Sequence, residues 1–136
     1  MKPLNTILLI DDDETTNYLN HRLLSRMQVA KDIRVVTDGE QALGYLTNAY
    51  NATKDNPVPD LILVDIKMSV MDGFEFLDEY QRFEEIDKAK SIMLMLTSSA
   101  SFYDLERLKN YPDVKKHYSK PLTEADVREI VQQYFN

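Results

Sequence analysis

Five short apolar segments alternate with longer segments of mixed polarity along the chain. The apolar segments are residues 6–10, 33–36, 61–64, 92–96 and, more weakly, 114–118. Their hydrophobicity is continuous rather than alternating, which is typical of strands buried on both faces of a parallel sheet. We therefore predict five strands at these positions.

Apolar residues recur at three- and four-residue spacing after each predicted strand, as expected for amphipathic helices. The stripes are Leu19, Leu23 and Met27; Ala42, Leu43 and Leu46, from Gly39 onward; Phe76, Leu77, Tyr80 and Phe83; Leu105 and Leu108; and Val127, Ile130, Val131 and Tyr134. Thr123 and Asp126 have the spacing of a capping box that begins the last helix. The polar stretch 47–60 is expected to be an exposed loop, because it is rich in Asn and Pro.

The repeated strand–helix order predicts an α/β protein, an open and doubly wound parallel sheet with helices on both faces. A length of 136 residues fits one domain with one core, and the last helical stripe runs to the C-terminus. We therefore expect a single domain over residues 1–136.

Composition and charge narrow the classes of function. The net charge of −7 argues against a non-specific nucleic-acid binder, which needs a basic face to neutralise phosphates. The absence of cysteine excludes disulfides, thiolate metal sites and cysteine nucleophiles, and the three glycines exclude a Walker loop and a dinucleotide fingerprint. No segment approaches the roughly 20 apolar residues that span a bilayer. We expect a cytoplasmic protein that contacts neither membrane nor nucleic acid directly.

Carboxylates directly follow the first and third apolar segments. Asp11 and Asp12 come after the first segment, and Asp65 comes after the third. Open α/β sheets bind ligands at the carboxyl ends of their strands, and neighbouring strands lie about 4.8 Å apart, so the three side chains can converge. Their mutual repulsion would be relieved by a hard divalent cation such as Mg²⁺. Asp13 and Glu14 are expected to begin the first helix, where acids favour the positive end of the dipole.

Polar groups also end the fourth and fifth strands, where Thr97 and Ser98 follow one segment and Lys120 follows the other. A hydroxyl and an ammonium beside carboxylates and a metal are suited to a phosphoryl group, which one carboxylate could carry as an acyl phosphate. Each residue alone has an ordinary explanation as a turn residue, helix cap or solvated lysine. Asp72, before Gly73, is interpreted in that way as the cap of the third helix. The carboxylates, the Thr97 hydroxyl and Lys120 are expected to converge at one edge of the sheet, and this convergence favours a phosphoryl-binding site over five unrelated surface residues.

Four motifs carry a resemblance to a known family: "LLIDDDE" (8–14), "LILVDIKMSVMDG" (61–73), "MLTSS" (95–99) and "YSKPL" (118–122). In this order and spacing, the chain resembles the receiver domain of two-component response regulators over essentially its full length. The resemblance implies a flavodoxin-like (βα)5 fold with strand order 2-1-3-4-5. It also implies a stand-alone receiver without an output domain, similar to chemotaxis regulators.

The resemblance assigns roles to individual residues. Asp65 would be the phosphoacceptor, and Mg²⁺ would be held by Asp65, Asp11, Asp12 and the backbone carbonyl of Lys67. Thr97 would be the switch hydroxyl, Lys120 would pair with the phosphoryl group, and Ser98 would keep the site open. The peptide bond between Lys120 and Pro121 would be cis.

The same resemblance implies partners. The phosphoryl group would come from a histidine kinase or a phosphotransfer protein, and the signal would reach a downstream protein through the fourth helix, the fifth strand and the fifth helix. Such a domain catalyses its own phosphorylation and dephosphorylation but is a signalling protein rather than an enzyme. The sequence does not name the kinase or the target.

The sequence departs from the family pattern at three positions. Ser69 stands where relatives usually have Pro, Lys67 places an ammonium two residues past Asp65, and His117 stands where relatives usually have a switch aromatic. Two alternatives also remain open. One is a phosphatase of the haloacid-dehalogenase type, in which Asp11 would be the nucleophile and Asp13 the general acid or base. The other is a degenerate receiver that acts only as a protein-binding module.

Overall fold

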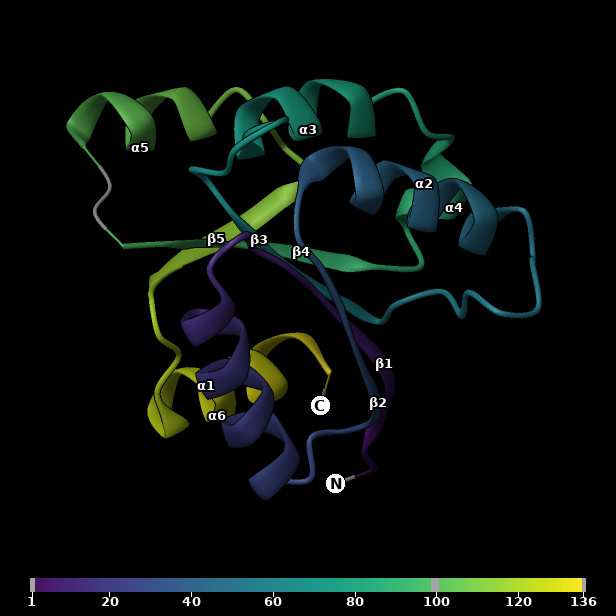
Figure 1. The fold of residues 1–136 in the computed structure, drawn as a ribbon, viewed down its shortest axis with the longest axis vertical. Coiled ribbons are helices and arrows are strands. Elements are labelled where there is room, and N and C mark those ends of the chain that lie inside the picture. The colour runs from purple at the N-terminus through teal and green to yellow at the C-terminus, as the bar shows by residue number, and fades with distance from the viewer. Residues whose placement is uncertain (1, 99–100, 136) are drawn as a thin grey trace.

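The computed structural model describes residues 2–98 and 101–135, and in them five strands form one sheet (Figure 1). The strands are β1 (Leu4–Ile10), β2 (Ala30–Val36), β3 (Leu61–Asp65), β4 (Ile92–Thr97) and β5 (Val114–Ser119). All five predicted strands are confirmed. The structure extends each of them by one to three residues, most of all β2, an edge strand that begins at Ala30 and continues with the charged Lys31 and Asp32.

Six helices connect or follow these strands within the described residues. They are α1 (Glu14–Arg26), α2 (Gly39–Tyr50), α3 (Gly73–Tyr80), α4 (Glu85–Lys88), α5 (Phe102–Leu108) and α6 (Glu124–Tyr134). The helix α4 was not predicted, because a single turn is too short to show a periodic pattern. The predicted caps are confirmed: Asp72 is the N-cap of α3 and Thr123 is the N-cap of α6, each in a capping box.

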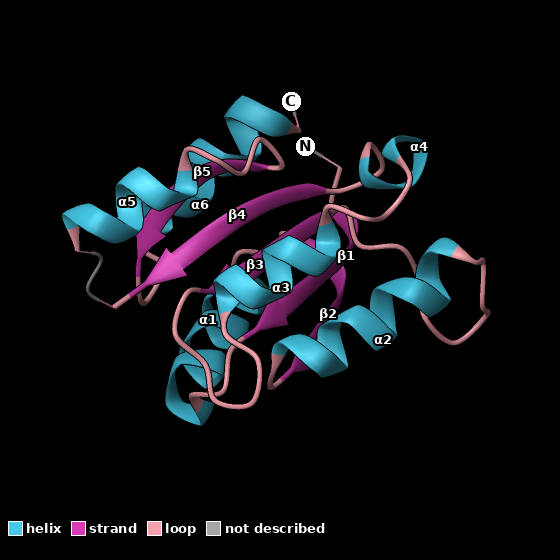
Figure 2. Cartoon of the chain, turned by 90° about the horizontal axis from the view of Figure 1, so that it is seen from above, coloured by secondary structure: helices cyan, strands magenta, loops and turns pink. Residues whose placement is uncertain are grey.

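All strands are parallel, in the order β2-β1-β3-β4-β5, which confirms the flavodoxin-like topology (Figure 2). β1 and β3 are therefore neighbours at the centre of the sheet, and Ile10 pairs with Val64. This register places the residues that follow Ile10 beside Asp65, the last residue of β3.

Helices cover both faces of the sheet, with α1 and α6 on one side and α2, α3, α4 and α5 on the other (Figure 1). Alternate residues of each central strand enter the two cores. In β1, Leu8 and Ile10 pack under α2 and α3, whereas Ile7 and Leu9 pack under α1 and α6. Burial on both faces explains why the central strands β1, β3 and β4 appear in the sequence as continuous apolar runs.

The structure corrects two predictions about helices. In the predicted stripe of α1, Leu23 and Met27 are partly buried and pack against the core, but Leu19 is exposed, and the fully buried residues of the helix are Thr16, Asn17, Asn20 and Leu24. The first turns of α1 lie over the polar end of the sheet, so polar side chains face inward there. The expected loop 47–60 is also wrong in its first part, because α2 continues to Tyr50, whose ring is buried and whose hydroxyl lies 3.0 Å from that of Ser91.

None of the helices in residues 2–98 and 101–135 combines the length and the apolar character needed to cross a membrane.

Candidate functional site

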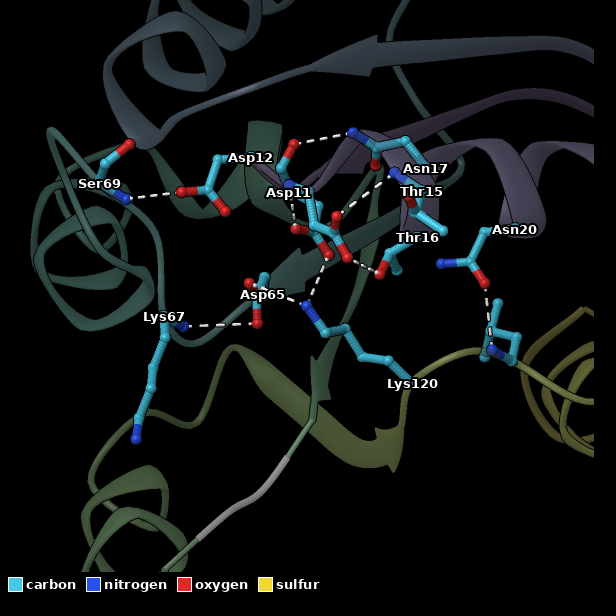
Figure 3. A network of polar contacts seen from close by, with 12 residues as sticks. Asp11, Asp12, Thr15, Thr16, Asn17, Asn20, Asp65, Lys67, Ser69 and Lys120 are labelled. Atoms are coloured by element: carbon cyan, nitrogen blue, oxygen red, sulfur yellow. Dashed lines mark hydrogen bonds and ion pairs between the residues drawn. The ribbon is translucent and has the colours of Figure 1, made fainter.

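Three carboxylates meet at the carboxyl end of β1 and β3 (Figure 3). Asp11 and Asp65 are buried and Asp12 is exposed. Each residue offers one carboxylate oxygen, and these oxygens all lie within 4.8 Å of one another. The predicted convergence is confirmed, and the geometry suits a hard cation with oxygen ligands.

Backbone amides hold the three carboxylates in place. Asp13 donates its N–H to Asp11 Oδ1 at 2.9 Å, and Lys67 donates its N–H to Asp65 Oδ1 at 3.4 Å. Ser69 donates its N–H to Asp12 Oδ2 at 2.9 Å. The contact of Ser69 ties the turn after β1 to the loop after β3, and a proline at position 69 would have no N–H to make it.

Lys120 brings the end of β5 into the same cluster. Its Nζ lies 3.1 Å from Asp11 Oδ2 and 3.2 Å from Asp65 Oδ2, and its side chain is only 9% exposed. The backbone N–H of Lys120 donates to the carbonyl of Thr97 at 2.9 Å, and the Lys120–Pro121 peptide is cis, as the resemblance implied. One ammonium therefore serves two buried carboxylates.

The cluster has more negative than positive charge, because three carboxylates face the single ammonium of Lys120. Burial, and after it the nearby charge of Asp11, raise the pKa of Asp65 to about 6, although Lys120 acts in the opposite direction. Burial acts to lower the pKa of Lys120, but its contacts with Asp11 and Asp65 outweigh this and raise it, so the ammonium stays charged. An additional cation would offset the remaining negative charge.

Thr97 and Ser98 lie at the same edge as the carboxylates. Thr97 ends β4 and is buried, and β4 pairs with β3 through Leu96 and Asp65. Ser98 follows it and is exposed. Both hydroxyl residues therefore lie at the end of the strand that neighbours β3 and Asp65.

Lys67 and His117, two of the residues that depart from the family pattern, both have exposed side chains. The side chain of Lys67 is exposed and points away from the carboxylates (Figure 3). His117 is exposed on β5. Its neighbour Tyr118 packs in the core beneath α1 and α6 and donates its hydroxyl to Glu129 at 2.8 Å. Tyr118 therefore cannot replace an aromatic at position 117, because it faces the other side of the sheet.

Asp13 is the N-cap of α1, as predicted for the start of that helix. Its carboxylate accepts hydrogen bonds from the Thr16 hydroxyl and from the N–H of Thr15. The hydrogen bond from the Thr16 hydroxyl lowers the pKa of Asp13; burial acts against it, and the backbone hydrogen bonds add to the lowering. A general acid needs a raised pKa, so this arrangement does not favour the phosphatase alternative.

Asn17 and Asn20 were missed by the reasoning from sequence. Asn17 donates from Nδ2 to the carbonyl of Asp11 at 2.8 Å, and Asn20 accepts through Oδ1 from the N–H of Leu122 at 3.0 Å. A signal was present, because asparagine is unfavourable inside a helix and two occur three residues apart. The positions alone do not reveal what the two side chains contact.

Comparisons with known proteins agree with this geometry. The family model described as "Response regulator receiver domain" matches residues 7–132. The crystal structure of a two-component response regulator from Cytophaga hutchinsonii superposes with a TM-score of 0.88 and 30% identity, over 99% of both chains.

Curated relatives differ in how much of their length the chain spans. The probable methanogenesis regulatory protein FilR2 of Methanothrix harundinacea is 28% identical over 93% of this chain and 79% of its own length. Hybrid signal transduction histidine kinase L of Dictyostelium discoideum is 27% identical over 98% of this chain but only 7% of its own length. With the fold, the carboxylate cluster and the family match in agreement, this chain belongs to the receiver-domain family of response regulators.

Proposed function

We propose that this receiver domain accepts a phosphoryl group on Asp65 in a Mg²⁺-dependent reaction and passes the signal on through protein contacts. The observation that carries the proposal is the cluster itself: Asp11, Asp12 and Asp65 within 4.8 Å, with the ammonium of Lys120 bonded to two of them. Receiver domains bind Mg²⁺ through such aspartates, and these residues fit a hard cation.

Each side chain has a task in the transfer. An oxygen of Asp65 attacks phosphorus, the bond from phosphorus to the donor breaks, and the donor leaves with the bonding electrons. Asp11, Asp12 and the carbonyl of Lys67 would hold Mg²⁺, which supplies positive charge to the phosphoryl oxygens. Lys120, already bonded to Asp65, would pair with one phosphoryl oxygen, and the Thr97 hydroxyl would donate to another. Ser98, small and exposed, would leave access open.

The donor in this proposal is a histidine kinase or a phosphotransfer protein. The curated relatives include hybrid histidine kinases from Dictyostelium discoideum, which contain a segment similar to this chain. The receiver, acting as a single domain over residues 1–136 in the cytoplasm, would signal to a downstream protein through α5, β5 and α6. In the same proposal, His117 on β5 would be the switch residue that responds to phosphorylation together with Thr97.

The test is labelling with acetyl phosphate and Mg²⁺, followed by mass mapping of the modified residue. We expect one phosphoryl group on Asp65 in the wild type and none in Asp65→Asn. Asp72→Asn is the matched control, because it changes an acid of the same motif to a residue that caps a helix equally well, and it should label normally. Labelling on Asp11 would favour the phosphatase alternative. No labelling, with a melting temperature indifferent to Mg²⁺, would favour a degenerate receiver.

A further inference from the structure

The inward face of α1 carries two asparagines that contact opposite halves of the site. Asn17 is 7% exposed and reaches the carbonyl of Asp11, at the end of β1. Asn20 is 2% exposed and reaches the backbone of Leu122, two residues after Lys120. In Figure 3 the two side chains leave the same helix in different directions, one toward the carboxylates and one toward the loop that follows Lys120.

The contact of Asn17 completes the support of Asp11. The N–H of Asp11 donates to the carbonyl of Val36 at 3.2 Å, which anchors the residue to β2. The carbonyl of Asp11 accepts a hydrogen bond from Nδ2 of Asn17 in α1. Both polar groups of the Asp11 backbone are therefore bonded, and the direction in which its carboxylate leaves the chain is set from two sides.

The contact of Asn20 completes the support of Lys120 in the same way. The N–H of Lys120 is bonded to the carbonyl of Thr97, and the next residue, Pro121, has no N–H. The N–H of Leu122 is thus the first donor after the lysine, and it is bonded to Asn20. These two bonds flank Lys120 and hold its backbone between β4 and α1.

Packing alone gives little reason for asparagine at either position. Both lie inside a helix, where asparagine has a lower propensity than leucine or alanine, and both are surrounded by protein. Leu24, on the same buried face, shows that an apolar residue is accommodated on this side of α1. What distinguishes the two asparagines is their partners: Asn17 contacts the backbone of Asp11 in the site, and Asn20 contacts the backbone of Leu122, two residues after Lys120.

We propose that Asn17 and Asn20 are positioning residues for phosphoryl transfer with separate tasks. Asn17 holds Asp11 where it binds Mg²⁺, and Asn20 holds the backbone that directs Lys120 at the phosphoryl group on Asp65. The inference rests on the proposed function, because it assigns roles relative to the metal and the phosphoryl group. It also predicts that the two roles can be separated experimentally.

The experiment measures three quantities for each variant: the dissociation constant of Mg²⁺ by calorimetry, the rate of Asp65 labelling by acetyl phosphate at saturating Mg²⁺, and the melting temperature without Mg²⁺. For Asn17→Ala we expect Mg²⁺ binding to weaken about tenfold, as is typical when an outer contact of a metal ligand is lost. Its labelling rate at saturating Mg²⁺ should change less than about twofold. For Asn20→Ala we expect labelling to slow about tenfold while Mg²⁺ binding does not weaken.

Conservative variants separate positioning from packing. Asn20 acts as an acceptor, so Asn20→Asp keeps the necessary oxygen and should restore much of the labelling rate. Asn17 acts as a donor, so Asn17→Asp loses the N–H and should not restore Mg²⁺ binding. Leu24→Ala is the packing control, and it should lower the melting temperature while leaving both the Mg²⁺ affinity and the labelling rate of the folded protein unchanged.

The outcomes decide between distinct conclusions. If Asn17→Ala and Asn20→Ala behave like Leu24→Ala, the two residues are structural only and the inference is wrong. If each variant weakens Mg²⁺ binding and slows labelling to the same extent, the division of tasks is wrong. If an alanine variant does not fold, Asn17→Ser or Asn20→Ser, which keep a polar group but not its reach, takes its place with the same expectations. A wild type that is not labelled at all would instead overturn the proposed function.

Discussion

Gly73 lies directly against the backbone of Asp65, so that a β-carbon added at position 73 would be 2.4 Å from the carbonyl oxygen of Asp65. It would also be 2.8 Å from the Cα of Ile66, and the N–H of Gly73 donates to the Ile66 carbonyl at 2.8 Å. These neighbours are backbone atoms, which cannot turn aside as a side chain can. The start of α3 therefore approaches the end of β3 this closely because residue 73 is glycine.

Gly73→Ala should displace the end of β3 that carries Asp65. We expect the free energy of unfolding to fall by about 1–3 kcal/mol, the usual cost of overpacking, and the labelling of Asp65 to slow. Denaturant unfolding measures the first effect. The matched control is Gly44→Ala in α2, where a β-carbon would meet no atom of the described residues within 4 Å and should stabilise the helix by about 0.5–1 kcal/mol. Equal effects at the two glycines would show that the close approach is unimportant.

Val70 has a positive φ of 61°, and its side chain is 74% exposed. A β-branched residue in this region is strained, whereas asparagine adopts it at lower cost. Val70→Asn should therefore raise the free energy of unfolding by about 1 kcal/mol. Val70→Thr, which stays β-branched but becomes polar, should leave stability nearly unchanged in the same denaturant measurement. If the threonine variant gains as much as the asparagine variant, the gain comes from removing exposed apolar surface rather than from relief of strain.

The N–H of Ser69 holds the carboxylate of Asp12, and this contact depends on the backbone rather than on the serine side chain. Ser69→Pro removes the N–H, so Asp12 should be less well oriented and Mg²⁺ should bind up to about tenfold more weakly. Ser69→Ala keeps the N–H and should bind Mg²⁺ as the wild type does. Calorimetric titration distinguishes the two variants, and an unchanged affinity in Ser69→Pro would mean that Asp12 needs no such support.

The pKa of Asp65, raised by burial from an ordinary 3.8 to about 6, links stability to pH in the absence of divalent cations. Between about pH 4 and pH 6 the folded protein binds more protons than the unfolded chain, so its free energy of unfolding falls as the pH rises. Asp65→Asn removes this effect. We expect it to be more stable than the wild type by roughly 1–2 kcal/mol at neutral pH in EDTA, less than the full shift because solvent screens part of the charge.

The stability difference between Asp65→Asn and the wild type should shrink as the pH is lowered through 6 and disappear below about pH 4, where Asp65 becomes protonated in the unfolded as well as the folded state. Thermal unfolding in EDTA over this pH range provides the measurement. A difference that stays constant with pH would show that the asparagine acts through packing and not through charge.

Lys120 and a bound cation would compete for the same carboxylate oxygens, since the ammonium lies within 3.2 Å of both Asp11 and Asp65. Lys120→Ala should therefore lower the melting temperature without Mg²⁺, because two buried carboxylates lose their partner, and should bind Mg²⁺ several-fold more tightly. Labelling at saturating Mg²⁺ should nevertheless slow, because the phosphoryl group also loses its partner. Weaker Mg²⁺ binding in Lys120→Ala would indicate that the lysine orients the carboxylates rather than competing for them.

Much of the fold and part of the candidate site follow from the sequence by itself. Strands buried on both faces must be apolar at successive positions, so β3 is recognisable from the apolar residues 61–64, all of which are buried. Because the ends of parallel strands share one edge, the positions of Asp11, Asp65 and Lys120 after apolar runs were enough to predict that they converge. Local hydrogen bonds also have local signals, which is why the caps at Asp72 and Thr123 were predicted correctly.

The tertiary structure decided what depends on contacts between distant residues. Asn20 and Leu122 are 102 positions apart, and no helical periodicity distinguishes an asparagine that faces a loop from one that faces solvent. The N–H of Ser69 and the close approach of Gly73 to Asp65 likewise arise from how a loop folds over a strand end. The pattern of polar and apolar residues in the sequence predicts which side chains are buried and which are exposed. The partner that each buried polar group finds depends on chain segments that only the folded sheet and helices bring together.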